Sequence, residues 1–177
     1  MVALARLWSA LKMGKDMRLA LLVAVLLVTH VLVESSQGVL KAMTKNFLTA
    51  YEVCVKEYNL PEATTMELMN FWKDDFVSTN RDVGCAILCL SSKLNLIDPE
   101  GKLHHGNAAE FAKTHGSDDS TAKQLVEILH SCEQSAVGED HCMKALAVAL
   151  CFKKEIHTLN WAPDAEVLFE EIISEKL

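Results

Sequence analysis

The sequence has no run of alternating apolar and polar residues of the kind that a half-buried β-strand shows. It also has no internal repeat or low-complexity stretch, and its three prolines and seven glycines form no linker that would separate domains. These absences argue against sheet-based folds, repeat arrays and multidomain arrangements. Apolar residues recur instead at steps of three and four, which predicts an all-α, compact single domain of about six helices.

An excess of basic charge is also missing. The chain has 17 Lys and Arg against 24 Asp and Glu, a net charge of −7, which argues against nucleic acid and anionic membranes as partners. The G-x-S-x-G motif of serine hydrolases is absent, and no His lies beside a Cys-rich calcium loop as in small secreted lipases. Asp98, His104 and His105 form too weak a pattern for a metal site. We therefore expect no enzyme activity, no cofactor and no metal.

A ten-residue apolar run, LALLVAVLLV, covers residues 19–28. Four basic residues precede it: Arg6, Lys12, Lys15 and Arg18. A basic stretch, a short apolar core and small residues near its end are typical of a secretory signal peptide. Val33 and Ser35 suit the two positions before a cut, so we expect residues 1–35 to be a signal peptide cleaved before Ser36.

Two alternatives concern this N-terminal segment. A membrane anchor is the first, although ten apolar residues fall short of the roughly 20 that span a bilayer. The second is a start at Met17, with residues 1–16 as an upstream extension. Residues 36–177, the expected secreted domain, carry 13 basic and 22 acidic side chains, a net charge of −9.

Six cysteines, all within residues 36–177, predict three disulfides in a secreted chain. Cys85 and Cys89 are four residues apart, so they would lie on the same face of a helix with roughly parallel Cβ vectors, poorly set to bond each other. We expect each to bond a cysteine on a different element, so that one helix is fastened twice. A metal or redox role for the pair is the alternative.

Helical periodicity places the expected helices at residues 37–58, 64–72, 80–95, 106–116, 119–134 and 141–159. Thr64 and Glu67 have the spacing of a capping box. Residues 141–159 are apolar almost all round, which predicts the buried centre of the fold.

The order and spacing of the cysteines resemble those of the insect odorant-binding proteins. Between successive cysteines stand 30, 3, 42, 9 and 8 residues. The blocks NFWKDDF, GCAILCLSSKLN, DPEGKLHHGNA, EFAKTHG and CFKKEIHTLNWAP narrow the resemblance to the moth pheromone-binding proteins, over the whole of residues 36–177. The resemblance implies three pairs: Cys54–Cys89, Cys85–Cys142 and Cys132–Cys151.

The resemblance also implies an apolar internal cavity that holds a long-chain alcohol, aldehyde or acetate. The ligand-binding positions carried over from the family are Phe47, Phe71, Trp72, Ile87, Ser91, Phe111, Val126, Leu129 and Phe152. Leu40 matches a further aliphatic position. In an arbitrary helical protein such aromatic residues would be ordinary core. Ser91 is the expected polar contact for the head group, and the alternative is a hydrogen bond from its hydroxyl to the carbonyl of Ile87.

Two features suggest release of the ligand on acidification, as the resemblance also implies. The first is a group of histidines, His104, His105 and His130, which would gain charge and repel as the pH falls through about 6.5. The second is the C-terminal tail, residues 162–177, with an apolar helical stripe among acidic residues. We expect protonation of Glu166, Glu171 and Glu175 to let the tail form a helix inside the cavity and expel the ligand.

These observations predict a secreted carrier of hydrophobic pheromones or odorants, which the resemblance places in the sensillar lymph of the antenna. The alternative is that the ligand-bound protein itself docks on an olfactory receptor or on the neuronal membrane. Acidic patches at residues 73–75 and 117–120 could serve that docking, although such runs are usually solvated faces. A homodimer is a further expected partner.

Overall fold

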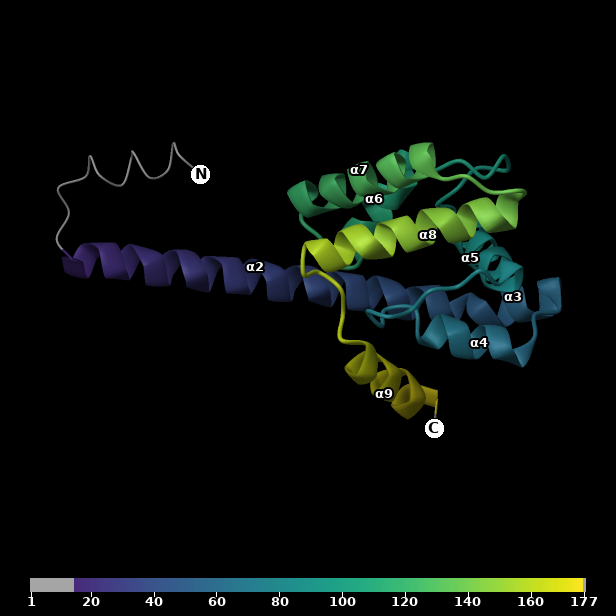
Figure 1. Ribbon diagram of the computed structural model, residues 1–177, viewed down its shortest axis with the longest axis horizontal. Helices are drawn as coiled ribbons and strands as arrows, with labels where there is room; N and C mark the ends of the chain where they lie inside the picture. The colour runs from purple at the N-terminus through teal and green to yellow at the C-terminus, as the bar shows by residue number, and fades with distance from the viewer. Residues whose placement is uncertain (1–14, 177) are drawn as a thin grey trace. The chain divides into compact units, whose positions relative to one another are not determined.

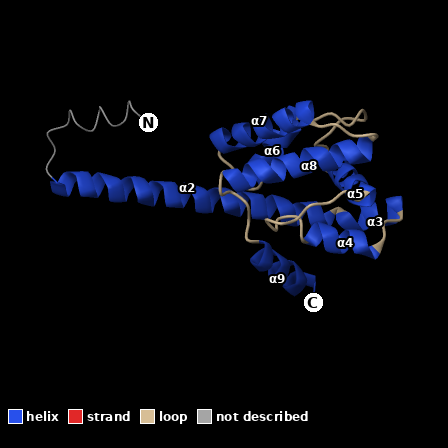
Figure 2. Cartoon of the chain, viewed as in Figure 1, coloured by secondary structure: helices blue, strands red, loops and turns tan. Residues whose placement is uncertain are grey.

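The computed structural model describes residues 15–176, apart from the side chains of residues 15, 16, 32, 34, 173, 175 and 176. The chain divides into two compact units, Met1–Glu34 and Ser35–Leu177. Its helices are α2 (Lys15–Thr49), α3 (Tyr51–Tyr58), α4 (Glu62–Met69), α5 (Arg81–Lys93), α6 (His105–Thr114), α7 (Asp119–Ser135), α8 (His141–Thr158) and α9 (Ala165–Lys176) (Figure 1). Between residues 15 and 176 no strand is formed (Figure 2), and the only extended pairing is an isolated bridge of Ile97 with Leu103. The all-α prediction is confirmed.

In the first unit, the described residues form the beginning of α2. Their apolar side chains are exposed, Leu19 to 64% and Leu26 to 67%. From Met17 to Thr49 the helix is long and apolar enough to cross a membrane, by length and composition. A signal sequence meets the same description, so signal peptide and membrane anchor both remain predictions here.

The second unit contains more helices than the six expected from periodicity. The expected helix over residues 37–58 is interrupted, because α2 ends at Thr49 and α3 begins at Tyr51. Ala50 between them keeps a helical conformation, with φ −83° and ψ −11°. The tail adds α9, which periodicity indicated only as an apolar stripe.

The capping box expected at Thr64 is wrong. Helix α4 begins two residues earlier, at Glu62 with Pro61 as its N-cap, so Thr64 lies inside the helix and is fully buried. Glu67 instead accepts hydrogen bonds from the hydroxyl of Ser78 and from the side-chain amide of Asn80, at 2.7 and 2.6 Å. It therefore fixes the segment that leads into α5.

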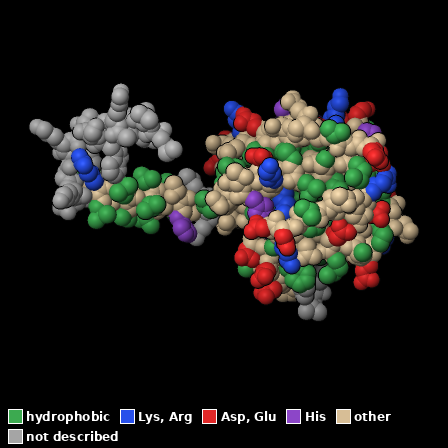
Figure 3. Space-filling model, in the orientation of Figure 1, with side chains coloured by type: hydrophobic (Ala, Val, Ile, Leu, Met, Phe, Trp, Pro, Cys, Tyr) green, Lys and Arg blue, Asp and Glu red, His purple; other side chains and the backbone are tan. Residues whose placement is uncertain are grey.

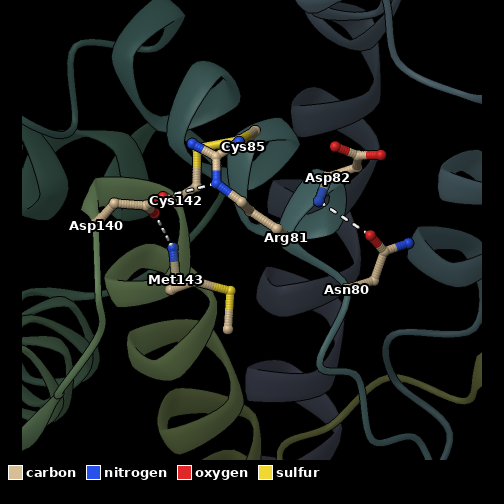
Figure 4. The surroundings of a disulfide bond; sticks show 7 residues. All are labelled: Asn80, Arg81, Asp82, Cys85, Asp140, Cys142 and Met143. Carbon is tan, nitrogen blue, oxygen red and sulfur yellow. Dashed lines mark hydrogen bonds and ion pairs between the residues drawn. A yellow bond between two sulfur atoms is a disulfide. The ribbon is translucent and has the colours of Figure 1, made fainter.

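Five other helices begin at a side chain that caps them, including α9, where Oδ1 of Asp164 accepts from the backbone N–H groups of Glu166 and Val167. The cap accepts a hydrogen bond from a backbone N–H of the first turn, which satisfies a group that has no partner within the helix. The other four caps are Asn80 for α5, His104 for α6, Asp118 for α7 and Asp140 for α8. Asp140 also lies 2.6 Å from Nε of Arg81, which joins the beginnings of α5 and α8 (Figure 4).

The three disulfides confirm the expected pairing. Cys54–Cys89 joins α3 to α5, Cys85–Cys142 joins α5 to α8, and Cys132–Cys151 joins α7 to α8. Helix α5 is thus fastened to two different helices, and its packing on α8 is very close. A Cβ atom at Gly84 would lie 2.1 Å from the carbonyl oxygen of Cys142, so only glycine fits at this contact.

The tail helix α9 packs through one side. Leu168 and Ile172 are buried in the same apolar cluster as Val39, Leu40 and Met43 of α2. The acidic face of α9 meets α2 as well, since Glu171 pairs with Lys41 and, at 2.8 Å, with Lys45. On the face seen in Figure 3, acidic and basic side chains are interspersed over the second unit.

Candidate ligand-binding cavity

A mostly apolar cavity of 310 Å³ lies inside the second unit. Helix α8 contributes Ala145, Val148, Ala149 and Phe152, whose spacing of three and four residues places them on one face. Helix α2 contributes a stripe of the same spacing, Leu40, Met43, Thr44, Phe47 and Leu48. Leu68 of α4, the following residues Phe71 and Trp72, and residues of α5, α6, α7 and the loop 96–103 complete the wall. The volume is at the lower end of the range of small-molecule sites.

Eight of the nine expected ligand-binding residues line this cavity. They come from six different parts of the chain: Phe47, Phe71, Trp72, Ile87, Ser91, Phe111, Leu129 and Phe152. Val126 is the exception, because it is half-buried on α7 but is not part of the lining. It lies three residues before Leu129, which does face the cavity. The role of the eight lining residues in ligand binding stays a prediction, whereas their location around one cavity is a property of the fold.

The aromatic side chains of the wall contact one another edge to face. The rings of Phe47 and Phe111 are 5.6 Å apart at 84°, and those of Phe71 and Trp72 are 5.2 Å apart at 83°. Such pairs add to the burial energy and hold the rings in fixed positions. The wall is therefore preformed on this side.

Ser91 is one of the few polar residues that line the cavity. It is half-buried, and among the described residues no hydrogen bond of this hydroxyl is formed, including the one to Ile87 weighed as an alternative. An unpaired hydroxyl facing an apolar cavity can donate to, or accept from, one polar group of a ligand.

One end of the cavity is polar, which the sequence reasoning missed. The loop 96–103 contributes Glu100 and Lys102, α7 contributes Glu133, and the beginning of α8 contributes His141 and Lys144. Glu133 fastens this end, since its Oε1 accepts a hydrogen bond from the backbone N–H of Leu103 at 2.7 Å. The sequence contained one indication of this polar end: Glu133 is a charged residue one helical turn after Leu129, on the face expected to point inward.

The three expected switch histidines do not form one cluster. Nε2 of His105 lies 3.0 Å from Nδ1 of His130, which joins α6 to α7. His104 has another role, because its Nδ1 accepts from the backbone N–H of Asn107 and caps α6. None of the three lines the cavity, but His130 is one turn before Glu133, which does.

The expected switch carboxylates of the tail have different surroundings. Hydrogen bonds from Lys41 and then from Lys45 hold the pKa of Glu171 below its ordinary value. Glu166 is exposed, and the side chain of Glu175 lies outside the described residues. No residue of α9 is among those that line the cavity, so the helix lies outside it, whereas the prediction placed it inside after acidification.

A second, open groove of 500 Å³ lies beside the tail. Its lining is largely polar and includes Gln37, Asp74, His157 and Asp164. Trp72 lines both this groove and the cavity, so its indole ring is part of the wall between them. The cavity is the better candidate for an apolar ligand, because burial of apolar surface needs an apolar wall.

The chain is similar to known proteins in both sequence and structure. Residues 36–155 match the PBP/GOBP family. The chain is 52% identical to pheromone-binding protein 2 of Epiphyas postvittana over 158 residues, 89% of this chain and 96% of that protein. It is 38% identical to general odorant-binding protein 1 of Antheraea pernyi, over 78% of this chain and 83% of that protein. The crystal structure of Epiphyas postvittana pheromone-binding protein 3 superposes with a TM-score of 0.60 at 54% identity, covering 65% of this chain and 99% of that one. The resemblance inferred from the cysteine spacing is confirmed, and the chain belongs to the PBP/GOBP family.

Proposed function

We propose that this protein carries a long-chain aliphatic pheromone or odorant through an aqueous medium in its internal cavity. The observation that supports this most directly is the convergence of Phe47, Trp72, Phe111 and Phe152, which come from four parts of the chain, on one apolar cavity. The names of the relatives, pheromone-binding and general odorant-binding proteins, support the same conclusion.

The energetics of such a cavity favour a carrier over a permanent lipid-binding site. Burial of about 14 methylene groups at ~0.8 kcal/mol each is worth on the order of 11 kcal/mol. Lost freedom on association removes several kcal/mol of this, which leaves an affinity near the micromolar mark or somewhat tighter. Methylene burial is non-directional, so the head group is recognised through Ser91 and the polar end of the cavity.

The carrier is secreted, with residues 1–35 removed as a signal peptide. The boundary between the two compact units, at Glu34 and Ser35, and the start of the family match at residue 36 support this position. By analogy with the moth pheromone-binding proteins that the chain resembles, the compartment into which it is secreted is the sensillar lymph of an antenna.

Release on acidification is the second part of the proposal. Its structural support is the contact of His105 with His130, because protonation of both rings would place two cations within 3.0 Å. Glu133 Oε2, 4.0 Å from Nδ1 of His130, would offset only part of this repulsion. The same Glu133 holds the loop that closes the polar end, so separation of α6 from α7 would open the cavity.

Docking of the loaded protein on a receptor or neuronal membrane is the alternative role. Charge reversal in the acidic patch 117–120 would test this role, but Asp118 caps α7 and its loss would weaken the helix. Asp119 is the better site, since its side chain is exposed and pairs with Lys113, which is also exposed. A changed response of the receptor at unchanged ligand affinity would support docking.

A homodimer is a separate proposal, and the elution volume of the protein in size-exclusion chromatography would test it.

The decisive experiment measures displacement of a fatty fluorescent probe by long-chain alcohols, aldehydes and acetates at pH 7 and pH 5. The protein is purified from cells that express the full chain. Tight binding at pH 7 that is lost at pH 5 is the expected result. Equal binding at both values would leave the carrier and remove the acid release. No binding at either value, from a protein with intact disulfides, would remove the carrier function.

A further inference from the structure

The contact between His105 and His130 has the geometry of a pair of metal ligands. Each ring directs one nitrogen toward the other, Nε2 of His105 and Nδ1 of His130, and these atoms are 3.0 Å apart. The ring centroids are 4.8 Å apart and the planes are inclined at 59°, so the rings are not stacked. We propose that these two nitrogens form a binding site for one divalent transition-metal ion of the kind that prefers imidazole, such as Zn²⁺, Ni²⁺ or Cu²⁺.

The distance between the two nitrogens fits this assignment. Metal–imidazole bonds are about 2.0–2.1 Å long. Two such ligands are therefore about 2.9 Å apart when their bonds meet at a right angle and about 3.3 Å apart in a tetrahedron. The observed 3.0 Å lies between these values. Because the two nitrogens now share a hydrogen bond and face each other, each ring would have to turn by roughly 35–45°, with loss of the shared proton, to aim both lone pairs at one ion.

The surroundings of the pair hold one ring in place and leave the site open. Nε2 of His130, the nitrogen that does not face His105, lies 2.8 Å from the side-chain amide of Gln134. In this contact the amide nitrogen of Gln134 donates to the ring. With a metal ion on Nδ1 the Nε2 atom would carry the proton, and the amide would turn over to accept it through its oxygen, as an acceptor orients a ligating histidine. The side chain of His130 is 44% exposed, so water can reach the remaining coordination positions.

Glu133 lies near the site without being a ligand in this arrangement. Its Oε2 is 4.0 Å from Nδ1 of His130, and its Oε1 is held by the backbone N–H of Leu103. Among the described residues no group of three or more His, Cys, Asp and Glu is arranged to hold a metal ion. The proposed site is therefore one of two protein nitrogens completed by water, with a carboxylate beside it that adds favourable charge.

Such an ion would join two helices that the disulfides do not connect. His105 is the first residue of α6 and His130 is on α7, whereas the three disulfides connect α3, α5, α7 and α8. An ion that binds only the folded chain stabilises it by mass action. Bound metal should therefore raise the unfolding temperature, independently of any odorant.

Calorimetric titration of Zn²⁺ and Ni²⁺ into tag-free, metal-free protein, purified from cells that express the full chain, tests the site. We expect one ion per chain, a higher unfolding temperature with metal, and affinity weakened about tenfold or more in His105→Gln and in His130→Gln. His104→Asn is the matched control, because it removes the adjacent histidine but keeps a capping side chain for α6, and it should bind metal as before.

A spectroscopic measurement keeps the test valid if the variants fold poorly. The electron paramagnetic resonance spectrum of the unaltered protein with one Cu²⁺ should show coupling to two imidazole nitrogens. A spectrum without two imidazole nitrogens would overturn the proposal. So would the absence of binding, or binding that persists unchanged in folded His105→Gln.

Discussion

The indole N–H of Trp72 donates a hydrogen bond to the hydroxyl of Thr44 at 2.9 Å, across the wall of the cavity. Thr44 in turn donates to the carbonyl of Leu40 one turn earlier on α2. Trp72 is 7% exposed and lies between the cavity and the outer groove. One hydrogen bond therefore positions the largest side chain of the wall.

Substitution Thr44→Val should destabilise the protein by about 1–3 kcal/mol, because it leaves a buried indole N–H without an acceptor. Urea unfolding with intact disulfides measures the change. In the background Trp72→Phe the same substitution should cost clearly less, since no donor remains. Equal costs in both backgrounds would mean that the hydrogen bond contributes nothing measurable.

Substitution Ser91→Ala tests the recognition of the head group. Ser91 lines the cavity and its hydroxyl has no partner among the described residues, so it is available to a ligand alcohol or carbonyl. We expect affinity for long-chain alcohols and aldehydes to fall by about 0.5–1.5 kcal/mol, roughly two- to twelvefold, in probe displacement. The affinity of an alkane of equal length should stay the same. Ser92→Ala, at the exposed neighbouring position, is the control. A loss that is equal for alkane and alcohol would assign Ser91 to packing.

Substitution Glu171→Gln tests what holds the tail helix outside the cavity. Hydrogen bonds from Lys41 and Lys45 lower the pKa of Glu171, so the pairing stabilises the folded state above its unfolded pKa, about 4.5. That contribution is lost only as the pH falls below about 4.5, through the lowered folded pKa. The pairing of Glu171 with Lys41 and Lys45 should thus persist at pH 5, so protonation of Glu171 cannot start ligand release at that pH.

We therefore expect Glu171→Gln to move the midpoint of ligand release to higher pH, because the tail is already loosened at neutral pH. The pH dependence of probe binding measures the midpoint. Glu170→Gln removes the same charge at an exposed neighbouring position and should leave the midpoint unchanged. A midpoint that moves to lower pH in Glu171→Gln would support the original prediction that this carboxylate triggers release.

Substitution Gly84→Ala should prevent close packing of α5 on α8. The added Cβ would lie 2.1 Å from a backbone oxygen of Cys142, which cannot move independently of the disulfide. We expect a loss of about 3 kcal/mol or more in the free energy of unfolding, with incomplete oxidation of Cys85 and Cys142. Gly38→Ala is the control, because nothing lies within 4 Å of the added atom and α2 should gain about 0.5–1 kcal/mol. Wild-type stability of Gly84→Ala would contradict the packing described here.

Several features of this protein could be predicted from local sequence. Steps of three and four residues predicted the helices, since an amphipathic helix must place its apolar side chains on one face. The spacing of Cys85 and Cys89 predicted two partners for α5, because cysteines one turn apart have parallel Cβ vectors. The partners themselves came from the resemblance to a family, as did the residues of the cavity wall.

Other features depend on which faces of the helices pack against one another in the folded chain. Val126 and Leu129 are both apolar residues of α7, but only Leu129 lines the cavity. His104 and Asp118 looked like members of a switch and of a docking patch, whereas each caps a helix. Glu171 carries the same charge as Glu166, but two lysines of α2 set its pKa.

The sequence by itself determined the helical class, the doubly fastened helix and the apolar segment near the N-terminus, because periodicity, spacing and composition act over a few neighbouring residues. Only the tertiary structure decided that α9 packs outside the cavity, that His105 meets His130 and that one end of the cavity is polar. Each of these depends on contacts between residues from 25 to 130 positions apart, which no local pattern encodes.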